Sequence, residues 1–173
     1  DYMKFWKNFG MAFKEGIYED PANRVEIAEL SRFYSTNSTE KLTSLDEYIS
    51  RVNEGQTNIY YITGDDVPTL RNNPQLEAFK EKGLEVLLLT DPIDEFWVQT
   101  LTNFKGYPLK HVSQADVDLK FERKEPKADE GSLKKLTDFM AELFKNEVGK
   151  VVATEKLTKS PVSLTVENGQ MSI

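Results

Sequence analysis

"LEVLLLTDPIDEFW", residues 84–97, contains an aliphatic run that ends in acidic residues and two adjacent aromatics. A short run of this kind, bounded by turn residues, is typical of a strand buried in a sheet. "NIYYIT", residues 58–63, is a second such run. Between the two runs, Asn73 and Pro74 predict the start of a helix and Gly83 predicts its end. A strand, a helix and a second strand in this order indicate a parallel sheet covered by helices, which is an α/β fold.

The first 54 residues carry helical patterns instead. Asp20, followed by Pro21, predicts the N-cap and first turn of a helix that runs through Phe33. Ser44, with a glutamate three residues later, has the spacing of a capping box and predicts the start of another helix. The first helix has one aromatic face, which we expect to contact the core or a neighbouring subdomain. That face consists of Tyr2, Phe5, Trp6, Phe9 and Phe13.

Beyond residue 101 the patterns predict four further elements. "YPLKHV", residues 107–112, indicates a short strand, and the apolar spacing over residues 133–144 indicates an amphipathic helix. Strands are expected at residues 148–154 and 161–166. Residues 118–131 are charged and contain proline, which favours an exposed loop.

The acidic residues after the aliphatic run have a structural explanation. Asp91 suits an N-cap, Pro92 suits the first helical position, and Asp94 falls at the third, where an acid favours the helix dipole. The next two aromatics, Phe96 and Trp97, are neighbours in a helix and therefore point about 100° apart. At least one of these rings should face the core, which leaves the other available for exposure.

A rival interpretation assigns chemistry to the acidic residues. In open α/β sheets, ligands collect at the carboxyl ends of strands, so these side chains could belong to a small enzyme that binds a nucleotide or another substrate. Against this, "ITGDD", residues 62–66, lacks the spacing of a dinucleotide fingerprint and the lysine of a Walker motif, and predicts a tight turn. The acidic residues concerned are Asp65, Asp66, Asp91, Asp94 and Glu95.

Composition narrows the possible functions. The 173 residues are 39% hydrophobic, which is enough for a packed core, and their net charge of −7 argues against a nucleic-acid partner. No cysteine is present, and the single histidine, His111, rules out a histidine-rich metal site and receives no role. No aliphatic run approaches a membrane span and no leader pattern opens the chain, so a cytoplasmic protein is expected.

Three segments resemble the chaperones of the heat-shock protein 90 family. They are "SLDEYISRVNEGQTNIYYITG" at residues 44–64, "LEVLLLTDPIDEFWVQTL" at 84–101 and "GKVVATEKLTKSPVSLTV" at 149–166. "FWKNFG" and "EGIYEDPANR", near the start, look like the bacterial branch, high-temperature protein G. The resemblance therefore covers nearly the whole chain and indicates a bacterial, cytoplasmic protein, with a mitochondrial homologue as the alternative.

The resemblance implies the latter part of the family's middle domain. Residues 1–54 would be a helical connector, and residues 55–158 a small three-layer αβα sandwich with a mostly parallel sheet. Residues 159–173 would begin the carboxyl-terminal domain. ATP and magnesium would bind in the amino-terminal domain of a longer parent ATPase, so we expect no cofactor and no catalysis in this segment.

The same resemblance implies the partners. They are unfolded or partly folded client proteins and the neighbouring amino- and carboxyl-terminal domains of the parent. Glu95, Phe96 and Trp97 fall on a helix that the family uses for client contact. The segment should be a monomer, because the helices that make the parent a homodimer would lie beyond it. Two rivals remain at this point, the small enzyme and a passive spacer between domains.

Overall fold

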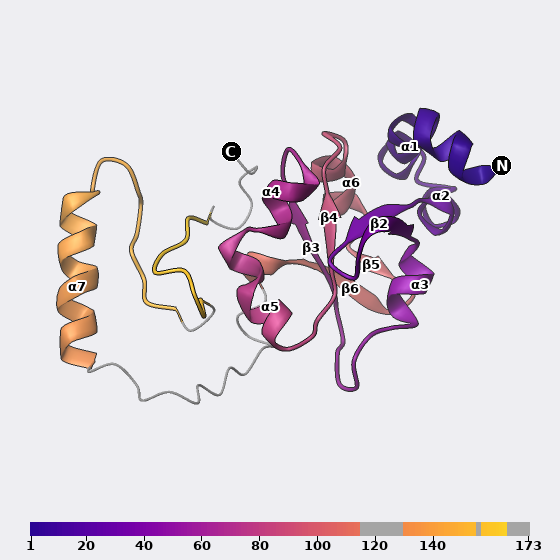
Figure 1. Cartoon of the computed structure of the whole chain (residues 1–173). Helices are drawn as coiled ribbons and strands as arrows, with labels where there is room; N and C mark the ends of the chain where they lie inside the picture. The colour runs from indigo at the N-terminus through magenta and orange to yellow at the C-terminus, as the bar shows by residue number, and fades with distance from the viewer. Residues whose placement is uncertain (115–129, 155–156, 166–173) are drawn as a thin grey trace.

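The computed structural model describes residues 1–114, 130–154 and 157–165 (Figure 1). A six-stranded sheet lies at the centre, in the order β2-β1-β4-β3-β6-β5. The strands are β1 (Phe33–Ser35), β2 (Ser38–Thr43), β3 (Ile59–Thr63), β4 (Val86–Leu89), β5 (Asn103–Phe104) and β6 (Tyr107–His111). The helices are α1 (Tyr2–Glu19), α2 (Arg24–Leu30), α3 (Leu45–Ile49), α4 (Val67–Arg71), α5 (Glu77–Glu81), α6 (Asp94–Thr100) and α7 (Glu130–Leu143), with short 3-10 helices η1 (Pro74–Leu76) and η2 (Val112–Gln114).

The sheet is mixed, which confirms the α/β class and corrects the expectation of a mostly parallel sheet. The central strands β4, β3 and β6 pair in parallel, while β1, β2 and β5 pair antiparallel along both edges. The edge strands belong to hairpins whose connections are too short for a parallel crossover. In the β5–β6 hairpin, Lys105 and Gly106 both have positive φ, at 49° and 90°, as a tight hairpin turn requires.

The second helix ends earlier than the sequence predicted. Helix α2 stops at Leu30, and Ser31 already has an extended backbone. Residues 33–43, predicted to include the end of a helix, instead form the β1–β2 hairpin, which joins the sheet through β4. Phe33 is therefore a strand residue packed in the core rather than a helical one. Pairing with β4 stabilises an extended backbone that local spacing did not reveal.

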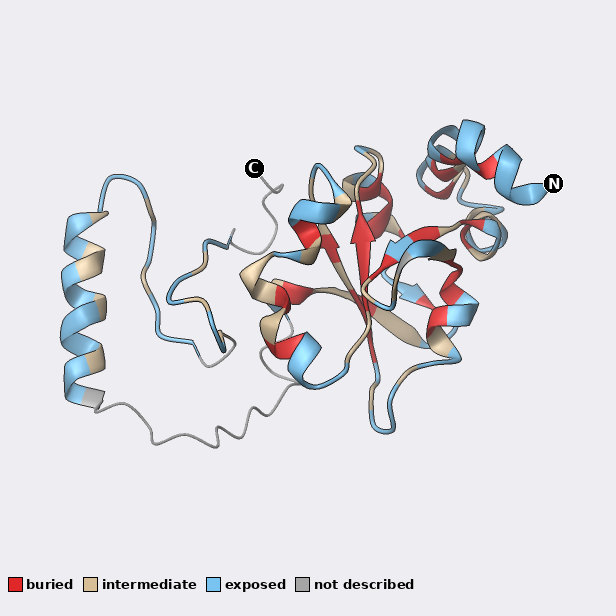
Figure 2. Cartoon of the chain, viewed as in Figure 1, coloured by how far each residue is buried: buried red, intermediate tan, exposed pale blue. Residues whose placement is uncertain are grey.

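Two hydrophobic cores lie on opposite faces of the sheet, which confirms the three-layer arrangement. Strand β4 contributes to both, because alternate side chains of a strand point to opposite faces. Leu87 and Leu89 pack beneath α1, α2, α3 and α6, whereas Val86 and Leu88 pack with η1 and α5 on the other face. Figure 2 shows buried residues concentrated along β3 and β4 between these two layers.

The carboxyl-terminal part differs from its predicted strands. Helix α7 confirms the predicted helix, but the described residues of 148–154 and 161–166 contain no strand. Between these two segments, the backbone amides of residues 158–160 donate to the Glu77 side chain. The predicted loop at residues 118–131 lies almost wholly outside the described residues. Within the described ranges, no helix is long and apolar enough to cross a membrane.

Two of the four helix caps predicted from the sequence, Ser44 and Asn73, are present in the structure. Ser44 accepts a hydrogen bond from the Glu47 amide and Glu47 accepts one from the Ser44 amide, which is a capping box at the start of α3. Asn73 accepts from the Gln75 amide, at the start of η1. The prediction that Asp20 is the N-cap of the second helix is wrong, because α2 begins only at Arg24 and its N-cap is Asn23. The Asp20 carboxylate holds the preceding turn, since it accepts from the amides of Ala22 and Asn23.

Candidate functional site

Helix α6 begins three residues later than its predicted cap. The helix starts at Asp94, and Ile93 occupies the N-cap position. Asp91 therefore does not cap the helix with its side chain. Instead, the Asp94 carboxylate accepts a hydrogen bond from the Asp91 backbone amide at 3.0 Å, so the acid at the helix start holds the incoming turn. The Asp91 carboxylate is left to pair with Lys14 of α1, at 2.6 Å.

A buried ion pair joins α1 to α6. The Lys14 ammonium lies 2.6 Å from the Asp94 carboxylate, and the two residues are only 4% and 1% exposed. The Trp97 indole N–H donates to the same Asp94 oxygen at 2.6 Å. Because a buried charge without partners is very costly, these contacts require Lys14 and Asp94 to stay together.

Aromatic rings enclose this ion pair. The Lys14 ammonium lies 5.5 Å from the centre of the Phe33 ring, and the Phe33 and Trp97 rings lie 5.5 Å apart. Burial raises the pKa of Asp94, whereas the Lys14 ammonium, the Trp97 indole and the Asp91 amide lower it. Helix α1, strand β1 and helix α6 thus meet at a single enclosed cluster.

The outer face of α6 carries the other aromatic. Phe96 is 45% exposed, while its neighbour Trp97 is completely buried. The structure thus shows which of the two rings faces the core, a point that the sequence left open. Phe96 packs edge-to-face against Tyr18 of α1, with ring centres 6.1 Å apart, and Tyr18 is also 45% exposed. Glu95 precedes Phe96 on α6 and is partly exposed; burial raises the pKa of Tyr61, and the charge of Glu95 raises it further.

The strand-end acids are not gathered into a metal-binding group. Asp66 caps α4 by accepting from the Thr69 amide, Asp91 and Asp94 are engaged by Lys14, and Asp65 is exposed. Among the described residues, no group of three or more His, Asp or Glu side chains could hold a metal ion. Their common position after strands therefore reflects helix starts and packing.

A second anchoring contact, which no local sequence pattern indicates, lies at the start of α5. The Glu77 carboxylate accepts backbone N–H groups from Thr158, Lys159 and Ser160, at 2.7, 2.7 and 3.1 Å, and it also accepts the Ser160 hydroxyl. These hydrogen bonds lower the pKa of Glu77 to about 2. We call this arrangement the Glu77 clasp. It fixes residues 158–160 to the sandwich, although they are about eighty positions away in sequence.

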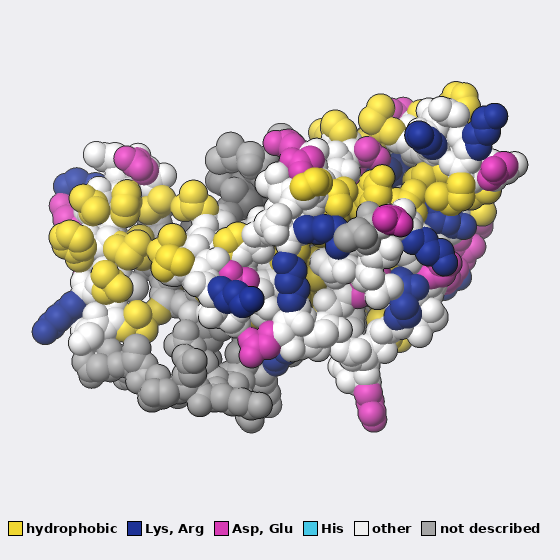
Figure 3. Space-filling model, in the orientation of Figure 1, with side chains coloured by type: hydrophobic (Ala, Val, Ile, Leu, Met, Phe, Trp, Pro, Cys, Tyr) yellow, Lys and Arg dark blue, Asp and Glu magenta, His cyan; other side chains and the backbone are white. Residues whose placement is uncertain are grey.

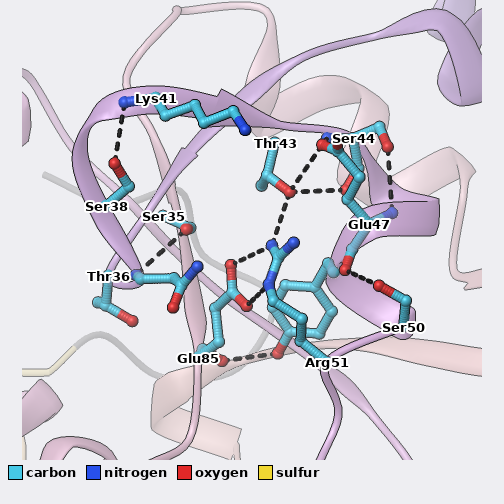
Figure 4. Close-up of polar contacts among 12 residues, drawn as sticks. Ser35, Thr36, Ser38, Lys41, Thr43, Ser44, Glu47, Ser50, Arg51 and Glu85 are labelled. Carbon is cyan, nitrogen blue, oxygen red and sulfur yellow. Dashed lines mark hydrogen bonds and ion pairs between the residues drawn. The ribbon is translucent and has the colours of Figure 1, made fainter.

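A polar network joins Thr43 of β2, Arg51 after α3 and Glu85 just before β4 (Figure 4). Arg51 donates to both Glu85 oxygens, at 3.0 and 2.9 Å, and to the Thr43 hydroxyl at 2.7 Å. The hollow beside it has a volume of only about 100 Å³. Because the Arg51 guanidinium is engaged by these partners, the network supports the fold rather than offering a cation to a ligand.

Comparisons with known proteins agree with this architecture. A family described as Hsp90 protein matches residues 1–172. The chain belongs to the Hsp90 family. It is 43% identical over 187 residues to the chaperone protein HtpG of Ehrlichia ruminantium (strain Welgevonden), and 45% identical over 181 residues to that of Roseobacter denitrificans. Both alignments cover 100% of this chain but 29% of the relative, so the chain spans less than a third of their length.

A solved structure supports the same placement within the family. The middle domain of a Plasmodium falciparum heat shock protein is 44% identical, with a TM-score of 0.62 over 65% of this chain and 48% of that one. The α/β sandwich of this chain therefore has the fold of an Hsp90 middle domain.

Replacing Lys14 with methionine tests the buried ion pair. Lys14→Met leaves the Asp94 carboxylate buried without its counter-charge, so we expect the free energy of unfolding to fall by about 3–5 kcal/mol. Urea denaturation measures the change. Lys7→Met removes an exposed lysine from the same helix and should alter stability by less than about 0.5 kcal/mol. A loss below about 1 kcal/mol for Lys14→Met would show that the pair does not fasten α1 to α6.

The Glu77 clasp predicts a specific pH dependence. Since the pKa of Glu77 falls from 4.5 to about 2, the clasp should be complete above about pH 4.5 and lost as the pH falls through about 2. Amide proton shifts of residues 158–160, followed by NMR, should report this titration. In Glu77→Gln these amides should already be displaced at neutral pH, whereas Glu81→Gln, on the exposed side of α5, should leave them unchanged. Identical spectra for Glu77→Gln and the parent sequence would refute the clasp.

Proposed function

We propose that this chain is a middle-domain segment of an ATP-dependent molecular chaperone that assists protein folding. It offers contact surface to client proteins and relays motion between the neighbouring domains. The observation that carries the client role is Phe96, a large aromatic that is 45% exposed on a helix fixed by a buried ion pair. Because the buried ion pair holds α6 in place, little conformational entropy should be lost when this ring contacts a partner.

The chemistry of α6 suits an unfolded partner. An aromatic ring supplies contact area without demanding one geometry, and a neighbouring carboxylate attracts basic groups. Glu95 and Phe96 provide this combination on the outer face. Trp97 was grouped with them on the sequence, but its ring is fully buried, so its proposed part is to anchor the helix.

The relay proposal rests on the two ends of the described sandwich. At one end, the ion pair between Lys14 and Asp94 fixes α1, through which force from the amino-terminal side would enter. At the other end, Glu77 holds residues 158–160, where the chain turns toward the carboxyl-terminal side. Because the packed cores between these points deform little, displacement of one end is passed to the other.

The remaining proposals are supported by the family membership. The parent protein would be a bacterial, cytoplasmic, homodimeric ATPase that binds ATP and magnesium in another domain, while this segment would be a monomer without catalytic activity or a cofactor. Its partners would be unfolded or partly folded clients and the adjoining domains, with no nucleic acid or membrane involved. The net charge of −7 supports the lack of nucleic-acid binding.

Client contact can be tested by removing the exposed ring. Phe96→Ser should weaken binding of a chemically unfolded model protein by about tenfold, equivalent to about 1.4 kcal/mol, with little loss of stability. Trp97→Ala should instead destabilise the fold by about 3–5 kcal/mol. Fluorescence anisotropy of the labelled client and urea denaturation measure the two effects.

The matched control for this experiment is Phe9→Ser, which removes an aromatic that is 58% exposed on α1 and should leave binding unchanged. If Phe96→Ser binds the client as tightly as the unsubstituted chain does, the client surface is rejected. If the unsubstituted 173-residue chain fails to suppress aggregation of the unfolded protein, a passive spacer is favoured.

Nucleotide titration separates the chaperone segment from the small enzyme. Because no phosphate-binding motif is present in the sequence, magnesium and ATP should give no saturable heat at micromolar concentrations in titration calorimetry. The exposed acid Asp65 provides the comparison variant. Micromolar binding that disappears in Asp65→Ala or Asp91→Ala would support the enzyme.

A further inference from the structure

Two exposed aromatic rings meet where helix α1 contacts helix α6. Tyr18 comes from the last turn of α1 and Phe96 from α6, and their rings lie 6.1 Å apart at 70°. Each residue remains 45% exposed, so the contact leaves much of both rings open to solvent. Figure 3 shows hydrophobic side chains gathered over α1. An aromatic pair built from two elements forms a larger contact surface than either ring alone.

The buried ion pair sets the position of this aromatic pair. Lys14 precedes Tyr18 by four residues on α1, which is one helical turn, and Asp94 precedes Phe96 by two on α6. The contact between Lys14 and Asp94 therefore fixes the relative positions of the two segments that carry the rings. Movement of α1 against α6 would break the buried pair and separate Tyr18 from Phe96.

The charges beside the rings are mainly negative. Glu15 and Glu19 are exposed on α1 next to Tyr18, and Glu95 is partly exposed next to Phe96. The positive charge of Lys14 does not offset them, because Lys14 is buried and paired with two aspartates. Arg24 is partly exposed and donates to the carbonyls of Ile17 and Tyr18, where it holds the end of α1.

We propose that Tyr18 and Phe96 form one composite docking surface for an extended segment of unfolded polypeptide in which apolar or aromatic residues adjoin arginine or lysine. This proposal rests on the client role of α6 and adds a second element, α1, and a preference for basic partners. The rings supply contact area, and the flanking glutamates favour cationic side chains. Because the surface is divided between α1 and α6, its affinity for the polypeptide depends on the position of α1.

Binding of two labelled peptides to the 173-residue chain tests the proposal. One unstructured peptide carries phenylalanines beside arginines, and the matched peptide carries glutamates in place of the arginines. We expect the arginine peptide to bind at least about tenfold more tightly at low salt, and Tyr18→Ser and Phe96→Ser each to weaken it by about three- to tenfold. The double variant should lose less than the product of the single losses, because the two rings act together.

Control variants separate binding from folding. Tyr18→Phe keeps the ring and should retain affinity, Phe9→Ser should bind as the parent sequence does, and thermal unfolding should show each variant folded at the assay temperature. If only Phe96→Ser weakens binding, the composite surface is rejected while the client role of α6 stands. If neither substitution weakens binding, both proposals are rejected. Equal affinity for the two peptides would overturn the preference for basic partners.

Discussion

The structure depends on one buried contact, the ion pair between Lys14 and Asp94. Among the described residues, these are the two charged side chains that are buried. Removing both from water is unfavourable, and their attraction compensates only if the geometry is good and the remaining lone pairs are satisfied. The second contact of Lys14 with Asp91 and the Trp97 indole N–H meet this condition. Such a pair is weak evidence for added stability, but it specifies one position of α1 against the sandwich.

That specified position determines what the outer surface presents. Once Lys14 and Asp94 are joined, Trp97 is enclosed against Phe33. The preceding ring of α6, that of Phe96, then points outward. Phe96 then meets Tyr18 at the surface. The buried ion pair and the exposed aromatic pair are thus two sides of the same helix contact, and a change that affects one must affect the other.

The two ends of the sandwich are fastened by different chemistry. The ion pair at α1 is enclosed and therefore hard to open, because each charge would lose its partner in an apolar environment. The Glu77 clasp is more accessible to water, so its hydrogen bonds can be exchanged for solvent at lower cost. In a relay between domains, the first contact would act as a fixed joint, and the second would act as one that can be released.

The sequence predicted the elements whose signals are local. The aliphatic run at residues 84–89, the capping box at Ser44 and the positive φ of Gly83 each depend on neighbouring residues, and each is present in the structure. The family resemblance also came from contiguous segments and is confirmed by the comparisons. The β1–β2 hairpin was missed, because its stability comes from pairing with β4, about fifty residues away.

By itself, the sequence determined the α/β class, the main helices and the family, since periodicity, capping and contiguous motifs carry that information. Only the tertiary structure decided that Phe96 is exposed and Trp97 buried, because helical geometry separates the two rings but does not say which faces the core. It also decided that Asp91 and Asp94 bind Lys14, and that Glu77 holds residues 158–160. These contacts join residues about eighty positions apart, and the partners come within reach of one another only once the chain has folded.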